Sequence, residues 1–317
     1  MVSIDIINRA VSRILRVKFL LGLFEKPYVD TNQVEGIVGC KKHRQLSREI
    51  ARKAIILLKN ENNILPLKKD IKSIAVIGPN ANNIYNQLGD YTAPQYLENI
   101  VTVLEGIKKK VAQNTAIHYA RGCRIKDMSK DGFPEAIEAV KESDIAIIVV
   151  GGSSARDFDI EHTPTGEAVI STEHSISDME CGEGFDRSEL NLTGVQLDLL
   201  KEVHKIGIPM VVVLIKGRPL SINWVAENAS AIIDAWYPGQ EGGSAIADVL
   251  FGDYNPAGRL PISVPKSVGQ LPIYYNYKPL ARKNYVFLDS KPLFPFGYGL
   301  SYTTFKYSNL NIMPKTF

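Results

Sequence analysis

Short runs of consecutive apolar residues constrain the fold of this chain more than any other feature. The clearest are Ser73–Gly78, Asp144–Gly152 and Met210–Ile215, and Ala231–Trp236 is a fourth. Runs of this length that are rich in β-branched residues favour strands. Because they are continuously apolar rather than alternating, we expect strands buried on both faces, as in a mostly parallel sheet.

Helical patterns separate these runs along the chain. We expect helices at about 102–111, 135–141, 197–204, 222–226 and 242–250, and a further strand at about 117–120. A repeated strand-helix-strand order implies a parallel sheet with helices on both faces, so the predicted fold class is an α/β sandwich. Upstream, apolar residues from Leu46 to Leu58 recur at helical spacing, which predicts a helix over about His43–Lys59.

The composition narrows the class of protein. The net charge is +3 and 22% of residues are charged, so nothing points to a nucleic-acid partner. No apolar run approaches the roughly 20 residues that a membrane span needs. Cys40, Cys123 and Cys181 are far apart, and the five histidines are scattered. We therefore expect reduced thiols, no metal site and no cofactor.

The N-terminal segment has three interpretations. Ile7, Val11, Ile14 and Leu15 share one helical face, with arginines and a lysine around them. Such a helix could be a targeting segment or lie on a membrane surface. Charges interrupt its apolar positions, so it is not a secretory signal. We favour a packed helix that belongs to a neighbouring domain, whose apolar face is exposed when that domain is absent.

Two regions break the regular pattern. Residues 153–191 form a long, strongly acidic loop, and loops of that length are usually functional or disordered. We expect this loop to be mobile when no neighbouring domain packs against it. Residues 253–300 are rich in proline, glycine and aromatic residues and are expected to cross the surface as an extended segment.

Several kinds of chemistry find little support. Pro79 follows the glycine after the first strand, and neither GxGxxG nor the lysine of a phosphate-binding loop is present, which argues against nucleotide binding. The GxSxG turn of serine hydrolases is also absent. The acidic loop has no calcium-binding spacing, so solvated carboxylates are the simpler account.

Acid/base catalysis by carboxyl groups is the kind of chemistry that remains after these exclusions. The segment Gly182–Arg187 reads GEGFDR, and its two glycines allow sharp turns around Glu183. Glycoside hydrolysis needs two carboxyl groups, one of which stays protonated. Glu180 and Asp186 would raise the proton affinity of Glu183, and Arg187 would lower it. A surface loop with an Asp186–Arg187 ion pair is the structural alternative.

The order of further motifs resembles the C-terminal part of glycoside hydrolase family 3, the β-glucosidase and β-xylosidase group. The matching segments are Arg13–Phe24, Ala54–Leu67, Ala75–Ala81, Gly89–Tyr91, Glu183–Arg187, Gly217–Leu220, Trp236–Gly243, Pro256–Pro261 and Phe296–Thr303. They run in register over nearly the whole chain.

The resemblance implies a division into domains. Residues 1–30 would be the last helix of an N-terminal barrel, and 31–69 a linker and helix. Residues 70–300 would form the family's α/β sandwich, and 301–317 the start of a fibronectin type III-like domain. The barrel with its nucleophilic aspartate is missing, so we expect a natural truncation, the product of a split gene, or a piece of a longer protein.

The resemblance also implies a retaining mechanism on terminal β-linked glucosyl or xylosyl residues. Glu183 is the expected acid/base, with Glu180 as the fallback. Asp186 and Arg187 would shape the loop. The nucleophile is expected from the barrel domain, in cis or in trans, so the chain alone should be inactive. The expected substrate is a β-linked oligosaccharide or an aryl glycoside; localisation stays open, although relatives are often periplasmic or secreted.

Two other functions stay open at this point. One is a non-catalytic carbohydrate-binding or scaffold module, which the missing barrel suggests. The other is nucleotide binding at the sheet.

Overall fold

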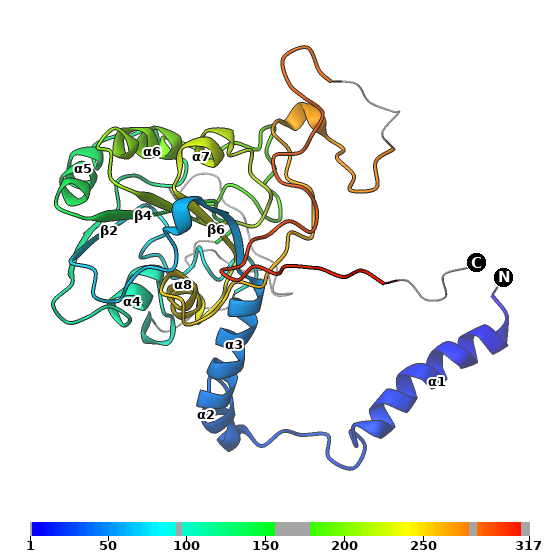
Figure 1. The fold of residues 1–317 in the computed structure, drawn as a ribbon. Coiled ribbons are helices and arrows are strands. Elements are labelled where there is room, and N and C mark those ends of the chain that lie inside the picture. Colours follow the sequence, from blue (N-terminus) through cyan, green and yellow to red (C-terminus); the bar gives the residue numbers. More distant parts are fainter. Residues whose placement is uncertain (1, 93–96, 156–177, 279–283, 312–317) are drawn as a thin grey trace. The chain divides into compact units, whose positions relative to one another are not determined.

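The computed structural model describes residues 2–92, 97–155, 178–278 and 284–311 (Figure 1). The chain divides into two compact units, Met1–Arg44 and Gln45–Phe317. The predicted boundaries at residues 30, 69 and 300 stay predictions.

The first unit consists of short helices. It holds α1 (Ile4–Leu20), the 3-10 turn η1 (Thr31–Gln33), α2 (Val34–Ile37) and the beginning of α3 (Lys41–Ala54). No residue of α1 is buried. Its apolar face is therefore exposed, as predicted.

The second unit is built on one six-stranded sheet. Its strands are β1 (Ile56–Asn60), β2 (Ser73–Ile77), β3 (Ala116–Ala120), β4 (Ile145–Gly151), β5 (Met210–Ile215) and β6 (Ala231–Trp236). Their order in the sheet is β1-β6-β5-β4-β2-β3. All neighbouring pairs are parallel except β1 and β6, which are antiparallel. The predicted mostly parallel sheet is confirmed.

Helices cover both faces of this sheet (Figure 1). The helices are α4 (Val103–Lys108), α5 (Phe133–Lys141), α6 (Gln196–His204), α7 (Asn223–Asn228) and α8 (Gly242–Leu250). Apolar residues of α5, α6 and α7 share one core with one face of the strands. Those of α4 and α8 share a second core with the opposite face. Strands buried from both sides explain the continuous apolar runs.

The predicted helix over 43–59 is wrong in its last five residues. Helix α3 ends at Ala54, and the chain continues into β1. Ile56 and Leu58 belong to one core, whereas Ile55 and Leu57 belong to the other. This alternation has the period of a strand, and it fits an edge strand that pairs with β6. The helical spacing arose because the apolar positions of the amphipathic helix α3 are followed directly by the apolar residues of β1.

Few regular elements occur elsewhere among the described residues. Short 3-10 turns lie at η2 (Glu61–Asn63), η3 (Leu97–Asn99) and η4 (Val268–Gln270). Beyond α8 the chain is extended. An isolated bridge from Leu57 to Leu300 attaches it to β1, and a second bridge, from Val264 to Phe294, joins two parts of the extended segment itself. Buried Leu260, Val264 and Phe294 join the core beside α7.

Candidate active site

The connections of the sheet reverse direction between β2 and β4. Strand β3 lies on one side of β2, and the chain then crosses to place β4 on the other side. In open α/β sheets, ligands bind at such a switch point, outside the carboxyl ends of the strands. The loops that follow β2 and β4 therefore define the edge at which a site is expected.

A buried polar network holds these loops together. The side-chain amide of Asn80 donates to the carbonyl oxygens of Gly152 and Ile215, at 3.3 Å each. Asn86 donates to Asn80 Oδ1 at 2.7 Å, and the Ser153 hydroxyl donates to Asn86 Oδ1 at 2.7 Å. Because buried polar groups are costly unless paired, this network fixes the ends of β2, β4 and β5 relative to one another.

Four backbone amides at this edge already donate hydrogen bonds within the protein. Gly78 donates to Ala120, Asn80 to Val149 and Gly152 to Ile215, in each case to the carbonyl oxygen. The amide of Gly151 donates to Gln196 Oε1 at 2.9 Å. A phosphate-binding loop needs such amides to point at its ligand. The geometry therefore gives no support to nucleotide binding.

Glu180 and Arg187 form a buried ion pair in the loop that precedes α6. Arg187 Nη1 lies 2.7 Å from Glu180 Oε2, and their side chains are 9% and 4% exposed. The Glu180 amide donates to the Ser153 carbonyl at 2.9 Å. A Cβ at Gly152 would come within 2.1 Å of Glu180 Oε1, so the carboxyl group packs directly against the backbone of Gly152. Glu180 therefore faces the sheet edge.

The predicted pairing of Asp186 with Arg187 is wrong. Asp186 accepts from the backbone amide of Arg187 at 2.7 Å, but its side chain pairs with Arg218 at 3.2 Å. The backbone hydrogen bond, followed by the Arg218 guanidinium, lowers the pKa of Asp186 below its usual range. The guanidinium of Arg187 is directed to Glu180 because that buried carboxylate needs a countercharge.

Glu183 lies at the outer side of the same loop. Its residue is exposed, unlike Glu180. The Tyr91 hydroxyl donates to Glu183 Oε2 at 2.8 Å. The backbone amide of Glu183 donates to Asp90 Oδ2 at 3.3 Å. The turn Gly89–Tyr91, which follows β2, thus contacts the GEGFDR segment.

Two further titratable groups lie beside the loop. Burial raises the pKa of the Cys181 thiol. Burial also raises the pKa of Tyr237 well above its usual range. The Cys181 sulfur lies 3.7 Å from Tyr237 Oη. Both groups are therefore held neutral near pH 7, and carboxyl groups are the better candidates for proton transfer here.

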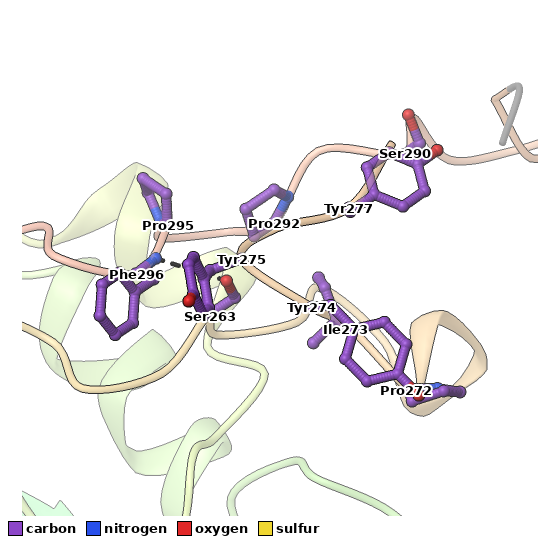
Figure 2. A pocket seen from close by; sticks show the side chains of 10 residues that line it. All are labelled: Ser263, Pro272, Ile273, Tyr274, Tyr275, Tyr277, Ser290, Pro292, Pro295 and Phe296. Atoms are coloured by element: carbon purple, nitrogen blue, oxygen red, sulfur yellow. Dashed lines mark hydrogen bonds between the residues drawn. The ribbon is translucent and has the colours of Figure 1, made fainter. Parts of the chain in front are cut away.

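A pocket of about 320 Å³ lies in the extended segment after α8 (Figure 2). Its walls are mostly aromatic and proline side chains, with Ser263 and Ser290 as polar members. The rings of Tyr275 and Phe296 stack with centroids 4.6 Å apart, and the Phe296 amide donates to Ser263 Oγ at 3.4 Å. None of the described residues of the acidic loop lines this pocket, and its lining contains no carboxyl group.

Metal sites, membrane spans and loop mobility were also considered from the sequence, and the described residues bear on the first two. They contain no cluster of three metal-ligating side chains. None of their helices is both long and apolar enough for a membrane crossing. The expected mobility of the loop 153–191 falls mainly on residues 156–177, which lie outside the described residues.

The four residues predicted for the site share one loop, but the sequence analysis did not predict the residues that they contact. Glu183, Glu180, Asp186 and Arg187 all lie within it, as predicted. The missed residues are Asp90, Tyr91, Ser153, Arg218 and Tyr237. Each follows the carboxyl end of a strand of the parallel sheet, and that position is the signal that could have identified them.

Comparison with known proteins yields a consistent set of similarities. Residues 55–302 match the model of the glycosyl hydrolase family 3 C-terminal domain. A β-xylosidase of Formosa agariphila is 48% identical over 95% of this chain and 40% of its own length. A periplasmic β-glucosidase of Salmonella typhimurium is 37% identical over 98% of this chain and 42% of its own length.

Solved structures of β-glucosidases show the same similarity. A β-glucosidase from Erythrobacter marinus superposes with a TM-score of 0.77 at 38% identity, over 95% of this chain and 40% of that one. A β-glucosidase from Listeria innocua in complex with isofagomine gives 0.78 at 28% identity, over 96% and 40%. The chain thus spans about 40% of the length of these relatives.

Proposed function

Because the chain belongs to glycoside hydrolase family 3 through its C-terminal domain, we propose that it supplies the acid/base half of a retaining β-glycosidase site. Its substrates would be terminal β-linked glucosyl or xylosyl residues of oligosaccharides or aryl glycosides. Relatives named as β-xylosidase and β-glucosidase support these two sugars.

One observation carries the assignment of the acid. Of the two glutamates considered, Glu183 is exposed at the switch-point edge, whereas Glu180 is buried and paired with Arg187. A proton donor must come within hydrogen-bond reach of the glycosidic oxygen. An exposed carboxyl group on an anchored loop meets that need better than a carboxylate directed at the sheet.

The proposed reaction has two steps. In the first, a nucleophilic aspartate of the barrel domain forms a bond to the anomeric carbon, the glycosidic C–O bond breaks, and Glu183 gives its proton to the leaving oxygen. In the second, the Glu183 carboxylate takes a proton from water, whose oxygen displaces the aspartate from the anomeric carbon. Configuration is retained because two displacements occur.

The other loop residues have positioning roles in this proposal. The ion pair between Arg187 and Glu180 joins two parts of the loop, and the Glu180 amide, which donates to the Ser153 carbonyl, attaches it to the end of β4. The pair between Asp186 and Arg218 anchors it to the segment after β5. The barrel domain, in cis or in trans, would contribute the nucleophile and most sugar contacts, so residues 1–317 alone would not turn over substrate.

The assignment is tested in the protein combined with a family 3 barrel domain. Glu183→Gln is expected to lower kcat/KM for an alkyl β-glycoside by about 10²-fold or more, because its leaving alkoxide needs a proton. Cleavage of a 2,4-dinitrophenyl β-glycoside in the first step should change little, because that leaving group needs none. Pre-steady-state release of dinitrophenol measures this step.

Two variants serve as comparisons. Glu189→Gln changes an exposed glutamate of the same loop and should leave both substrates unaffected. Glu180→Gln disturbs the anchor and should slow both substrates to a similar degree. If the leaving-group dependence followed Glu180→Gln instead, Glu180 would be the acid and the assignment of Glu183 would be incorrect.

A further inference from the structure

The turn Gly89–Tyr91, in the loop after β2, reaches the proposed acid. The Tyr91 hydroxyl donates to Glu183 Oε2 at 2.8 Å, although 92 residues separate the two in sequence. The ring of Tyr91 is largely exposed, so its hydroxyl is held by this contact and not by burial in the core.

The backbone of the turn has an unusual conformation that places Tyr91 next to Glu183. Tyr91 has φ of +57°, a left-handed conformation that bulky residues rarely adopt. Such conformations cluster at functional sites, where the surroundings enforce them. Gly89 has φ of +84°, and a Cβ there would meet the Tyr237 ring at 2.7 Å. The turn is thus pressed onto the end of β6 and directs Tyr91 outward.

Asp90 makes a second contact with the same segment. Its Oδ2 accepts the amide of Glu183 at 3.3 Å. Gly182 has φ of +124°, and a Cβ there would lie 2.8 Å from the same oxygen. Adjacent residues of one turn therefore hold the backbone and the carboxyl group of Glu183.

We propose that Tyr91, supported by Asp90, is a positioning residue that orients the acid/base carboxyl group of Glu183. This inference rests on the proposed function. A hydroxyl that donates to Oε2 uses a lone pair of that oxygen, which leaves the transferable proton on Oε1. Once Oε1 has given up its proton, the same hydrogen bond stabilises the carboxylate that must next activate water.

The test uses Tyr91→Phe, which removes only the hydroxyl, in the protein combined with a barrel domain. Hydrogen bonds to charged groups predict a loss of about 10-fold in kcat/KM for an alkyl β-glycoside. First-step cleavage of a 2,4-dinitrophenyl β-glycoside should remain within about 2-fold of the wild type. Tyr119→Phe, on β3, is the matched control and should change neither rate.

A second measurement is independent of catalysis. Amide hydrogen exchange of the chain alone should be faster in the peptide that covers Gly182–Arg187 when Tyr91 is Phe, and unchanged in peptides of the sheet. Asp90→Asn should increase exchange in the same peptide because its amide no longer offers a charged acceptor to the Glu183 amide. Circular dichroism confirms that both variants are folded.

The outcomes separate this inference from the proposed function. If Glu183→Gln shows the leaving-group dependence and Tyr91→Phe shows neither slower alkyl cleavage nor faster exchange, the positioning role is overturned and the function stands. If Glu183→Gln leaves alkyl cleavage unchanged, the acid assignment fails, and the positioning role fails with it. Equal losses on both substrates for Tyr91→Phe would indicate general disruption and also contradict the inference.

Discussion

At the scale of single residues, the geometry of the candidate site depends on which acidic side chain pairs with Arg187. Arg187 is one residue from Asp186 but pairs with Glu180. Sequence separation predicted the nearer partner, because neither burial nor side-chain direction is visible in a six-residue motif. Residue type and spacing alone predicted the loop and both glutamates as candidates, and their catalytic role stays a prediction.

Breaking the buried pair should destabilise the protein. Arg187→Met leaves Glu180 buried without its countercharge, which costs about 3 kcal/mol in the free energy of unfolding when the loop cannot open locally. Urea denaturation measures the change. Asp186→Asn, at a side chain that is 93% exposed, should change stability by less than about 0.5 kcal/mol. Equal effects of the two variants would contradict the buried anchor.

Among secondary-structure elements, the helix-to-strand change at residue 55 is the main departure from expectation. Periodicity correctly predicted the strands β2, β4, β5 and β6 because each is a continuous apolar run between polar turns. It failed at β1, where five residues follow an amphipathic helix directly. Pairing with β6 decides the outcome there, where Ile56 pairs with Asp234 and Asn60 pairs with Ala231, far along the chain.

Two substitutions test this assignment. Leu57→Ala should lower the free energy of unfolding by about 2–5 kcal/mol, because Leu57 is fully buried within β1. Ile50→Ala should cost less than about 1 kcal/mol, because Ile50 is exposed on α3. A continuous helix would place both side chains on one face and predict similar costs, so similar measured costs would argue against β1.

A charge cluster joins helices α3 and α8 to the turn that follows α4. The buried carboxylate of Asp248, on α8, accepts from Arg48 Nε at 2.7 Å and Arg52 Nε at 2.6 Å, and it also pairs with Lys110. Burial raises the pKa of Asp248, but the hydrogen bonds from Arg48, Lys110 and Arg52 outweigh it and lower the pKa below its ordinary value of 3.8.

This cluster predicts how stability depends on pH. Because the pKa of Asp248 is lower in the folded state, its stabilisation is complete above about pH 4 and is lost as the pH falls through the folded-state value. Asp248→Asn should therefore be clearly less stable at pH 7, by about 3 kcal/mol. The difference should shrink below pH 4. Urea unfolding at pH 7, 5 and 3 provides the comparison, and a difference that is constant with pH would contradict the cluster's role.

At the scale of the whole molecule, fold and family were predictable from the sequence because motifs recur in register along the chain. The edge geometry was not, since it depends on contacts between loops after β2, β4 and β5. The chain spans about 40% of the length of its relatives, and its second unit contributes one carboxyl group to the proposed site. We therefore propose that this acid works with a nucleophile from a barrel domain.

Complementation with a separate barrel domain tests whether the two parts form one catalytic site. The chain, a separately expressed family 3 barrel domain, and their mixture are assayed on 4-nitrophenyl β-glucoside and β-xyloside. We expect no turnover by the chain alone, turnover by the mixture, and a loss of about 10²-fold or more in steady-state turnover with Glu183→Gln, because the second step loses its base. Turnover by the chain alone would contradict the account, as would a mixture that is unaffected by Glu183→Gln.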